Sequence, residues 1–355
     1  MRPIALSKHT IEAGKRPFVI AELSGNHNRS LERALQLVEQ AAKAGADGVK
    51  LQTYTADTMT IDCNLADFVV SGTGEQWQDR TLYDLYDEAH TPWDWHEPIF
   101  KRCYELGMTP FSTPFDESAV DFLEGLNMEI YKVASFEMTD IPLLRKVAGT
   151  RKPVIMSTGM ASEDEIELAV QTLRENGCEQ LVLLKCTSAY PARFEDANAK
   201  TIEYLANRYT CLAGLSDHTM GPAVPVTATA LGAVVIEKHL TLSRAEGGVD
   251  SHFSMEPHEF QQMVALVKQS HSALGRVQTS PSDAELACRN YRRSIYITQD
   301  MKAGDTLSPE NTRVIRPGFG LPPSAYDDIL GQQVTQDCAR GTALTDALLG
   351  PKASS

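Results

Sequence analysis

The sequence predicts a (β/α)8 TIM barrel followed by a small C-terminal module rich in short strands. Between residues 18 and 274, short apolar runs alternate eight times with amphipathic helical stretches. The runs end in polar or charged residues, as buried parallel strands do where their C-terminal ends open into a binding site. Several helical stretches end in glycine, which suits a left-handed C-cap. An open doubly wound sheet is the alternative, but such a sheet would gather its polar residues at one switch point.

The predicted strands and helices alternate along this part of the chain. The strands are residues 18–22, 48–52, 108–112, 130–134, 153–157, 181–185, 212–218 and 234–239. The helices are residues 31–44, 93–106, 118–126, 142–148, 163–176, 201–209, 222–231 and 257–274. The glycines that would end helices include Gly45, Gly107, Gly177 and Gly232. Strands joined by helices in this way run parallel to one another.

One connection is much longer than the others. About 40 residues separate the second predicted strand from the helix that begins at residue 93, whereas βα loops usually have about 2–6 residues. The segment contains several aromatic residues, among them Tyr54, Phe68, Trp77, Tyr83 and Tyr86, so it is not a flexible linker. Two interpretations remain open: a lid or specificity loop over the barrel mouth, or a small additional subdomain.

The composition changes after the last predicted helix, which divides the chain into three parts. We expect a barrel domain at residues 1–276, a linker rich in Ser, Pro and Asp at 277–291, and a β-rich module at 292–355. Within the module, residues 292–297 and 312–316 are predicted strands. A core of this size is marginally stable alone, so the module is expected to pack against another surface.

Charge and cysteine content exclude several classes of function. The net charge of −14 disfavours nucleic acids and anionic membranes as partners. The N-terminal residues show no signal peptide, and no apolar run approaches the roughly 18 residues that span a bilayer. The seven cysteines are scattered and form no C-x-x-C pair. This pattern predicts reduced thiols and a cytoplasmic location, and it argues against a cysteine metal site.

Two histidines, His218 and His239, end neighbouring predicted strands, each close to a carboxylate. A single histidine in an apolar run is more often a packed core residue, but two at matching strand ends can meet on one metal ion. Neutral imidazoles with open positions favour Mn²⁺, Fe²⁺, Co²⁺ or Zn²⁺ over Ca²⁺. A closed structural zinc site would need two further N or S ligands. Asp217 is either a third ligand or a residue that orients His218, and we favour the second role.

The other strand ends also carry polar and charged residues. They include Glu22, Lys50, Gln52, Lys132, Ser135, Glu137, Ser157, Thr158, Lys185, Thr187, Ser188, Tyr190, Ser216, Glu237 and Lys238. Singly, each has a structural explanation, since Lys and Glu pair inside barrels as plain salt bridges. Burying the whole set without a ligand would cost several kcal/mol for each unpaired ion. We therefore expect a ligand rich in anionic oxygen, carrying phosphate, carboxylate or both.

Several motifs in order along the chain resemble the sialic acid synthase family. They are AELSGNHN at 21–28, KLQ at 50–52, STGM at 157–160, GLSDHT at 214–219 and EKH at 237–239. Enzymes of this family condense phosphoenolpyruvate with an acylamino sugar to give a nine-carbon 2-keto acid. The stretch RPGFGL at 316–321 is similar to the family's antifreeze-like (SAF) module. The resemblance implies a domain-swapped homodimer, in which this module of one subunit caps the barrel of its partner.

Other stretches resemble the pseudaminic acid synthase branch of the family. They are residues 50–55, 80–86, 89–93 and 250–254. The implied acceptor is 2,4-diacetamido-2,4,6-trideoxy-altrose in its open-chain aldehyde form, and the products are pseudaminic acid and phosphate. N-acetylneuraminate or legionaminic acid synthesis is the alternative within the family. Arg29 departs from the pattern, because a smaller or uncharged residue is expected there. It is either solvated or in contact with substrate.

The resemblance also implies roles for individual residues. The catalytic residues would be Glu22 and Glu137, which guide water and protons, and His218 and His239, which hold the metal. Mn²⁺ is the implied metal, with Mg²⁺ or Co²⁺ as alternatives. The residues implied for substrate binding are Lys50, Gln52, Lys132, Ser135, Ser157, Ser188 and Ser216 for phosphate and carboxylate, and Tyr190, Asp250 and the partner subunit's Arg316 for the sugar.

Some features fit more than one interpretation. Asn26 and His27 form either a structural turn or a substrate contact. We expect residues 93–95 to begin a helix, and His252 and His258 to be surface residues or caps. A metal-dependent aldolase or another phosphoenolpyruvate condensation would explain the histidines but not the C-terminal module. A carbohydrate-binding protein without turnover is the alternative from a different class, although such a protein has no reason to keep so many buried charges.

Overall fold

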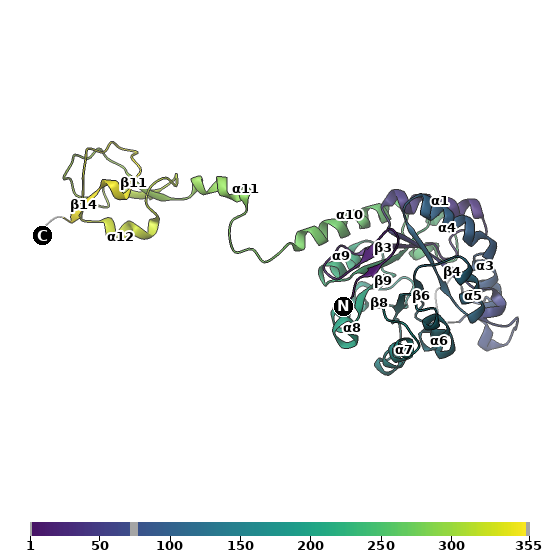
Figure 1. The fold of residues 1–355 in the computed structure, drawn as a ribbon. Coiled ribbons are helices and arrows are strands. Elements are labelled where there is room, and N and C mark those ends of the chain that lie inside the picture. The colour runs from purple at the N-terminus through teal and green to yellow at the C-terminus, as the bar shows by residue number, and fades with distance from the viewer. Residues whose placement is uncertain (1, 72–76, 353–355) are drawn as a thin grey trace. The chain divides into compact units, whose positions relative to one another are not determined.

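The computed structural model of the protein describes residues 2–71 and 77–352, and Figure 1 shows its fold. The chain forms two compact units, Met1–Gly275 and Arg276–Ser355. Among the described residues, no helix is both long enough and apolar enough to cross a bilayer.

Eight parallel strands form the sheet of the first unit. They are β3 (Phe18–Glu22), β4 (Gly48–Thr53), β5 (Thr109–Pro114), β6 (Tyr131–Val133), β7 (Val154–Ser157), β8 (Leu181–Cys186), β9 (Leu212–Asp217) and β10 (Val235–His239). They pair in the order β5-β4-β3-β10-β9-β8-β7-β6, and the end strands β5 and β6 lie against each other. The sheet thus curls into a barrel, and the predicted fold class is confirmed.

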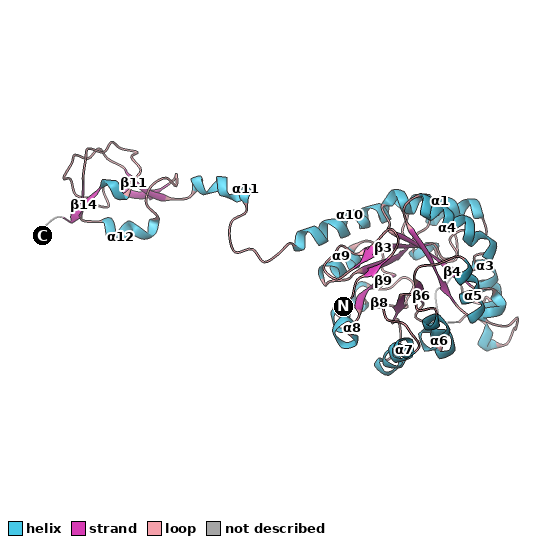
Figure 2. Ribbon diagram, in the orientation of Figure 1, coloured by secondary structure: helices cyan, strands magenta, loops and turns pink. Residues whose placement is uncertain are grey.

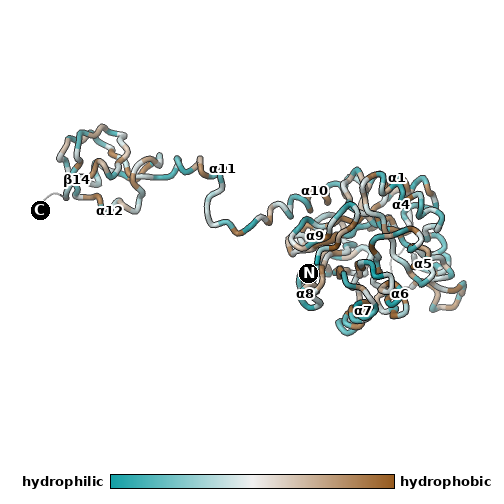
Figure 3. Tube along the Cα trace, viewed as in Figure 1, coloured by the Kyte–Doolittle hydropathy of each residue, from teal (hydrophilic) through white to brown (hydrophobic). Residues whose placement is uncertain are grey.

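Helices surround these strands, as Figure 2 shows. They are α1 (Leu31–Ala44), α4 (His96–Glu105), α5 (Glu117–Gly125), α6 (Ile141–Gly149), α7 (Glu163–Glu175), α8 (Thr201–Tyr209), α9 (Ala223–Ala230) and α10 (Pro257–Leu274). Helix α1 illustrates the local signals: the Ser30 side chain accepts a hydrogen bond from the Arg33 N–H, and Gly45 closes the helix at φ +88°. Hydrophilic and hydrophobic residues mix along the helices in Figure 3, as expected where one face covers a barrel.

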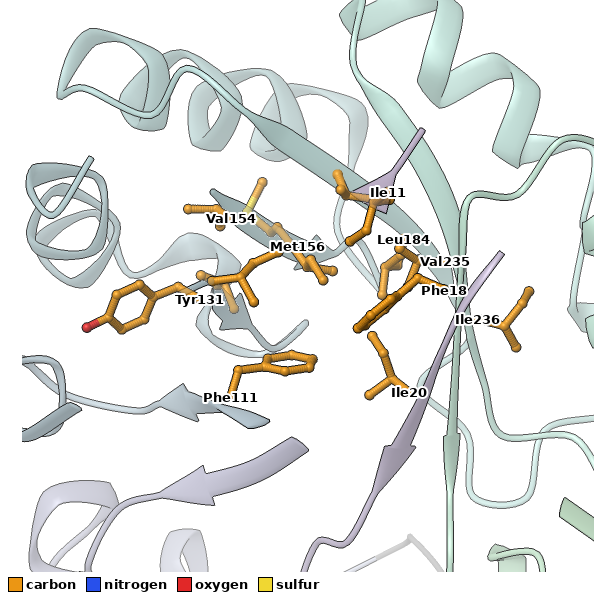
Figure 4. Close-up of a cluster of buried hydrophobic side chains, with 14 of the residues drawn as sticks. Ile11, Phe18, Ile20, Phe111, Tyr131, Val154, Met156, Leu184, Val235 and Ile236 are labelled. Atoms are coloured by element: carbon orange, nitrogen blue, oxygen red, sulfur yellow. The ribbon is translucent and has the colours of Figure 1, made fainter. Parts of the chain in front are cut away.

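The interior of the barrel is packed with apolar side chains at its N-terminal end. Figure 4 shows Phe18, Ile20, Phe111, Leu184 and Val235 among them. These side chains are almost completely buried. They form a solid floor, so any ligand must enter at the C-terminal end of the strands.

An N-terminal hairpin, which the sequence did not predict, covers that floor. Strands β1 (Ile4–Ala5) and β2 (Thr10–Ile11) pair antiparallel, and both isoleucines join the barrel core. Between them, the Ser7 N–H and hydroxyl each donate to the Glu129 carboxylate at 2.6 Å. Strands of two residues carry no recognisable alternation, which is why the hairpin escaped prediction.

The long connection between β4 and α4 is ordered where it is described. It contains α2 (Ala56–Met59), the 3-10 turn η1 (Ala66–Phe68), α3 (Leu82–Ala89) and the 3-10 turn η2 (Trp93–Trp95), which leads into α4 as predicted. Further 3-10 turns follow later strands: η3 (Glu137–Thr139), η4 (Phe194–Asp196), η5 (Arg244–Glu246) and η6 (Ser251–Phe253).

The second unit has two antiparallel strand pairs around its own small core. Strands β11 (Ser294–Ile297) and β12 (Thr312–Ile315) form one pair, and β13 (Gln332–Val334) and β14 (Leu349–Lys352) form the other. The first pair was predicted and the second was not. The remaining elements are α11 (Asp283–Leu286), η7 (Ala287–Tyr291), η8 (Pro323–Ala325), α12 (Tyr326–Ile329) and η9 (Asp346–Leu348). The segment expected to be a linker therefore contains α11 and η7.

Candidate active site

Four charged side chains from different strands meet at the C-terminal end of the barrel. Glu22 ends β3, Lys50 lies in β4, Lys132 in β6 and Glu237 in β10, and all are at most 4% exposed. The parallel register places Glu22 beside His239 and Ser216 beside Glu237. Because alternate residues of a strand point to the same face, Glu237 and His239 share one side of β10.

Lys50 links the two carboxylates of this charge cluster. Its Nζ lies 3.1 Å from Glu22 Oε2 and 3.2 Å from Glu237 Oε1. The Lys132 Nζ is 3.9 Å from Glu237 Oε1 and donates to Ser157 Oγ at 2.8 Å. The cluster thus contains two cations and two carboxylates, and their positions are set by strands rather than by flexible loops.

The charges of the cluster are unequally shared. Burial raises the pKa of Glu22 to about 7. The charge of Lys50 acts to lower this pKa, and the charge of Glu237 acts to raise it. Burial also acts to raise the pKa of Glu237, but Lys132 and Lys50 hold it below its usual value. Burial lowers the pKa of Lys132. Glu22 can therefore exchange a proton near neutral pH, while Glu237 stays ionised.

The predicted polar residues surround this cluster. Gln52 Nε2 donates to Glu22 Oε1 at 2.9 Å, and Ser216 Oγ donates to Glu237 Oε1 at 3.4 Å. Ser135 Oγ and Ser188 Oγ, from the ends of β6 and β8, are 3.0 Å apart. A Cβ at Gly159 (φ +45°) would lie 2.3 Å from the Ser135 Cβ, so only glycine lets the 157–160 turn approach so closely.

Glu137 has an environment similar to that of Glu22. It lies in η3, after β6, and burial raises its pKa to about 7. Among the described residues, its Oε2 has no hydrogen-bond partner, and the same holds for Glu237 Oε2 and His239 Nδ1. Buried polar atoms are normally hydrogen-bonded, so these three atoms are available to a ligand.

The two predicted metal ligands lie side by side. The ring centroids of His218 and His239 are 5.3 Å apart. With metal–nitrogen bonds of about 2.1 Å, two imidazoles on one ion place their centroids roughly 5 Å apart. His218 Nδ1 lies 2.9 Å from Thr187 O, so this nitrogen carries a proton and Nε2 is the ring nitrogen that could bind a metal, although the ring also has a hydrogen bond with the Cys186 thiol. Burial, followed by the charge of His218, holds the pKa of His239 well below its usual value, so that ring is neutral.

These residues fit a divalent ion with two protein ligands and open positions. Across residues 2–71 and 77–352, no group of three or more His, Cys, Asp or Glu side chains is arranged to hold a metal. Water or substrate oxygen would complete the coordination.

Asp217 does not orient His218, contrary to the role we favoured. Its Oδ2 lies 2.5 Å from Lys238 Nζ, and its carboxylate accepts from the Thr219 N–H and hydroxyl. Asp217 and Lys238 alternate with the histidines along their strands, so they point away from the barrel interior. The carbonyl of Thr187 fixes the His218 ring instead.

Other uncertain residues now have partners. Asn26 Nδ2 donates to Leu240 O and Ser254 Oγ, and His27 Nε2 lies 3.2 Å from the Thr91 hydroxyl, which supports the structural interpretation of both. Arg29 pairs with Asp87 at the surface. His252 is not a plain surface residue, because its Nε2 lies 3.2 Å from Tyr190 O.

The residues expected to bind sugar lie in two units. Tyr190 follows β8, with its ring centroid 4.5 Å from that of His218. Asp250 follows β10 and accepts a hydrogen bond from Ser24 Oγ. Arg316 belongs to the second unit, where it is exposed and directly follows β12.

Comparison with known proteins identifies the family. Residues 37–279 match the NeuB family, and residues 292–350 match the SAF domain. Pseudaminic acid synthase from Campylobacter jejuni is 42% identical over 94% of this chain and 96% of its own length. The chain belongs to the NeuB family.

Further NeuB-family relatives are more distant in sequence. N,N'-diacetyllegionaminic acid synthase from Legionella pneumophila is 36% identical over 92% of this chain and 93% of its own. The crystal structure of an N-acetylneuraminic acid (sialic acid) synthetase from Leptospira borgpetersenii superposes with a TM-score of 0.71 at 31% identity, covering 81% of this chain and 94% of that one. These matches confirm the resemblance read from the motifs, both to the family and to its pseudaminic acid synthase branch.

Sequence reasoning left out three residues of this NeuB-family site. Glu237 was noted at a strand end but not assigned, although its spacing of two from His239 already placed both on one face. Ser24 and Trp77 gave no such signal. Their partners, Asp250 and Val249, lie more than 170 positions away, and only the fold brings them together.

Proposed function

We propose that the chain condenses phosphoenolpyruvate with 2,4-diacetamido-2,4,6-trideoxy-altrose and water to give pseudaminic acid and phosphate. The observation that carries the proposal is the buried cluster of Lys50, Lys132, Glu22 and Glu237 directly beside the imidazole pair. It combines an anion site with a candidate metal site, which this reaction requires. The names and coverage of the relatives support the choice of sugar.

The lysines would hold the phosphate and carboxylate of phosphoenolpyruvate. Lys132 Nζ donates to two neutral oxygens, Val133 O and Ser157 Oγ, and its carboxylate partner Glu237 lies 3.9 Å away, so its charge is available to an anion. Hydroxyls of Ser135, Ser188 and Ser216 add directional hydrogen bonds. Such positioning can lower the barrier by several kcal/mol.

His218 and His239 would hold a divalent ion, for which we propose Mn²⁺, with Mg²⁺ or Co²⁺ as alternatives. When bound, such an ion polarises the aldehyde oxygen of the acceptor as a Lewis acid. The hydrogen bond that orients the His218 ring and the neutral ring of His239 suit them to this role.

Glu22 and Glu137 would move the protons of the reaction. C3 of phosphoenolpyruvate attacks the aldehyde carbon, and water then adds to the C2 cation before phosphate leaves. A carboxyl group with a pKa of about 7 can accept a proton from that water or donate one near neutral pH. Gln52 fixes the Glu22 carboxylate by its 2.9 Å hydrogen bond.

Tyr190 and Asp250 would bind the acylamino sugar. Tyr190 lies against His218, where the aldehyde must bind, and Asp250 can accept hydrogen bonds from sugar hydroxyl or amide groups. All seven cysteines are free, which supports a reducing, cytoplasmic location for the reaction.

We also propose a homodimer in which the partner's Arg316 binds an acetamido carbonyl, on the basis of the SAF match and the family resemblance. Mixing Arg316→Ala with His239→Ala subunits should then restore activity through hybrid dimers. No recovery after confirmed subunit exchange would contradict this arrangement.

Phosphate release from phosphoenolpyruvate tests the whole proposal. Purified protein with Mn²⁺ is assayed with the altrose sugar, its gluco- or manno-configured diacetamido isomer, and N-acetylmannosamine, each with and without EDTA. We expect chelator-sensitive release with the altrose sugar alone. Release with another sugar would support a legionaminic acid or N-acetylneuraminate synthase instead. No release from folded, metal-loaded protein would leave an aldolase or a carbohydrate-binding protein.

A further inference from the structure

Six aromatic rings form a closed circuit at the mouth of the barrel. The centroid distances between successive rings are 6.1 Å for Trp77–Tyr190, 4.5 Å for Tyr190–His218, 5.3 Å for His218–His239, 4.8 Å for His239–Phe253, 4.8 Å for Phe253–His252 and 5.7 Å for His252–Trp77. Rings at such distances attract one another, especially edge to face. The two candidate metal ligands are thus part of a larger aromatic wall.

Trp77 is the member of this circuit that comes from the long β4–α4 connection. The other five rings follow or end β8, β9 and β10. The indole of Trp77 is half-buried and meets the rings of Tyr190 and His252 at 66° and 82°. Through this one side chain, the connection contacts the segments that carry the candidate sugar-binding residues.

The polar edge of the indole is also fixed. Trp77 Nε1 donates to Val249 O at 3.0 Å. Val249 precedes Asp250, whose carboxylate accepts from Ser24 Oγ. Trp77 therefore restrains two sugar-binding candidates at once, Tyr190 by ring packing and Asp250 through its neighbour in the chain.

We propose that Trp77 is a specificity-determining residue for the acceptor sugar. It holds Tyr190 and the 249–253 segment in place and gives this side of the mouth an apolar wall. Such a wall favours acetamido methyl groups and a 6-deoxy carbon, whereas a hydroxyl placed against it would lose its hydrogen bonds to water. The inference rests on the proposed function, because it names how that site selects its acceptor.

Trp93 provides a matched control within the same connection. Its Nε1 also donates to a backbone carbonyl, Tyr54 O at 3.2 Å, and its ring packs against Phe122 at 4.7 Å. Phe122 lies in α5, outside the barrel, and among the described residues no ring of the circuit packs against Trp93. Loss of either indole removes a similar packing surface, but only Trp77 adjoins the candidate sugar site.

The test compares Trp77→Leu, Trp77→Phe and Trp93→Phe in the full-length, Mn²⁺-loaded protein. We expect Trp77→Leu to lower kcat/KM for the diacetamido altrose sugar roughly 10- to 100-fold, while KM for phosphoenolpyruvate stays within about 2-fold. Trp77→Phe keeps a ring and should lose less, and Trp93→Phe should change neither constant. Circular dichroism checks that each variant is folded.

Two results would overturn the inference. One is an unchanged kcat/KM for the sugar in Trp77→Leu, and the other is an equal loss for sugar and phosphoenolpyruvate. If wild-type protein turns over no acceptor, the proposed function fails separately. Calorimetric titration of the diacetamido sugar then decides the role of Trp77, because equal binding, or equal absence of binding, in wild type and Trp77→Leu contradicts it.

Discussion

Replacing Lys50 by Met would remove the cation between two buried carboxylates. Lys50 Nζ lies 3.1 Å from Glu22 Oε2 and 3.2 Å from Glu237 Oε1. Glu237 would keep Lys132 at 3.9 Å, whereas Glu22 has no other basic group within 4 Å among the described residues. We expect the variant to unfold more easily, because Glu22 becomes a buried charge without a partner.

The size of this loss should depend on pH. At about pH 8.5 Glu22 is ionised, and breaking a buried ion pair costs about 3–5 kcal/mol. At about pH 6 most Glu22 is protonated, because its folded pKa is about 7, and we expect a smaller loss of about 1–2 kcal/mol, from hydrogen bonding and from the weaker pairing of Glu237, which keeps Lys132. The sign follows from linkage: a carboxyl whose pKa is raised on folding binds its proton more tightly in the folded state, so rising pH destabilises it. Loss of Lys50 raises the pKa of Glu22 further, so the destabilisation of the variant keeps growing with pH until the pH reaches this higher pKa.

Urea unfolding followed by tryptophan fluorescence measures this loss. All three tryptophans, at positions 77, 93 and 95, lie in the first unit, so the signal reports on the barrel. Lys146→Met is the control, since Lys146 pairs with Asp121 at 2.6 Å on the surface, where a pair contributes about 0–1 kcal/mol at either pH. Adding Glu22→Gln to Lys50→Met should recover stability at the higher pH. A loss that is equal at both pH values, or smaller at the higher one, would refute the reasoning.

Three further predictions concern the residues around the cluster. His239→Ala should abolish Mn²⁺ binding, measured by calorimetry, and lower the unfolding midpoint, because the buried ring packs against His218 and Phe253; retained binding would exclude His239 as a ligand. Glu137→Gln should reduce, without removing, the change in phosphate release that we expect near pH 7, because Glu137 no longer changes ionisation there while Glu22 still does; an unchanged pH profile would exclude Glu137 from proton transfer. Lys238→Met should lower the free energy of unfolding by about 3–5 kcal/mol, since Asp217 is left buried without its cation; recovery in a double variant with Asp217→Asn checks the cause.

Much of the barrel was predictable because its signals are local. Apolar runs of four to six residues, amphipathic helices and glycine caps each depend on neighbours within one or two turns of chain. The positions of Glu22, Lys50, Lys132 and His239 at strand ends followed directly from these runs. The hairpin of β1 and β2 was missed because its strands are too short to show a pattern, and the β13–β14 pair was missed for a similar reason.

Pairing within the site could not be predicted in the same way. Asp217 precedes His218 in the chain, which suggested that it orients the imidazole. Side chains alternate between the two faces of a strand, so Asp217 points to the face opposite His218. There it pairs with Lys238 of β10. Sequence proximity and spatial proximity differ here because adjacent residues in a strand point in opposite directions.

The amino-acid sequence by itself determined the parallel barrel, the ends of its strands and the residue types that those ends carry, since each depends on local periodicity. The tertiary structure decided which charges meet, how burial divides the protons between Glu22 and Glu237, and how Trp77 joins the ring circuit. Ion pairing, desolvation and ring packing depend on distances between groups far apart in the chain, and only the closed fold sets those distances.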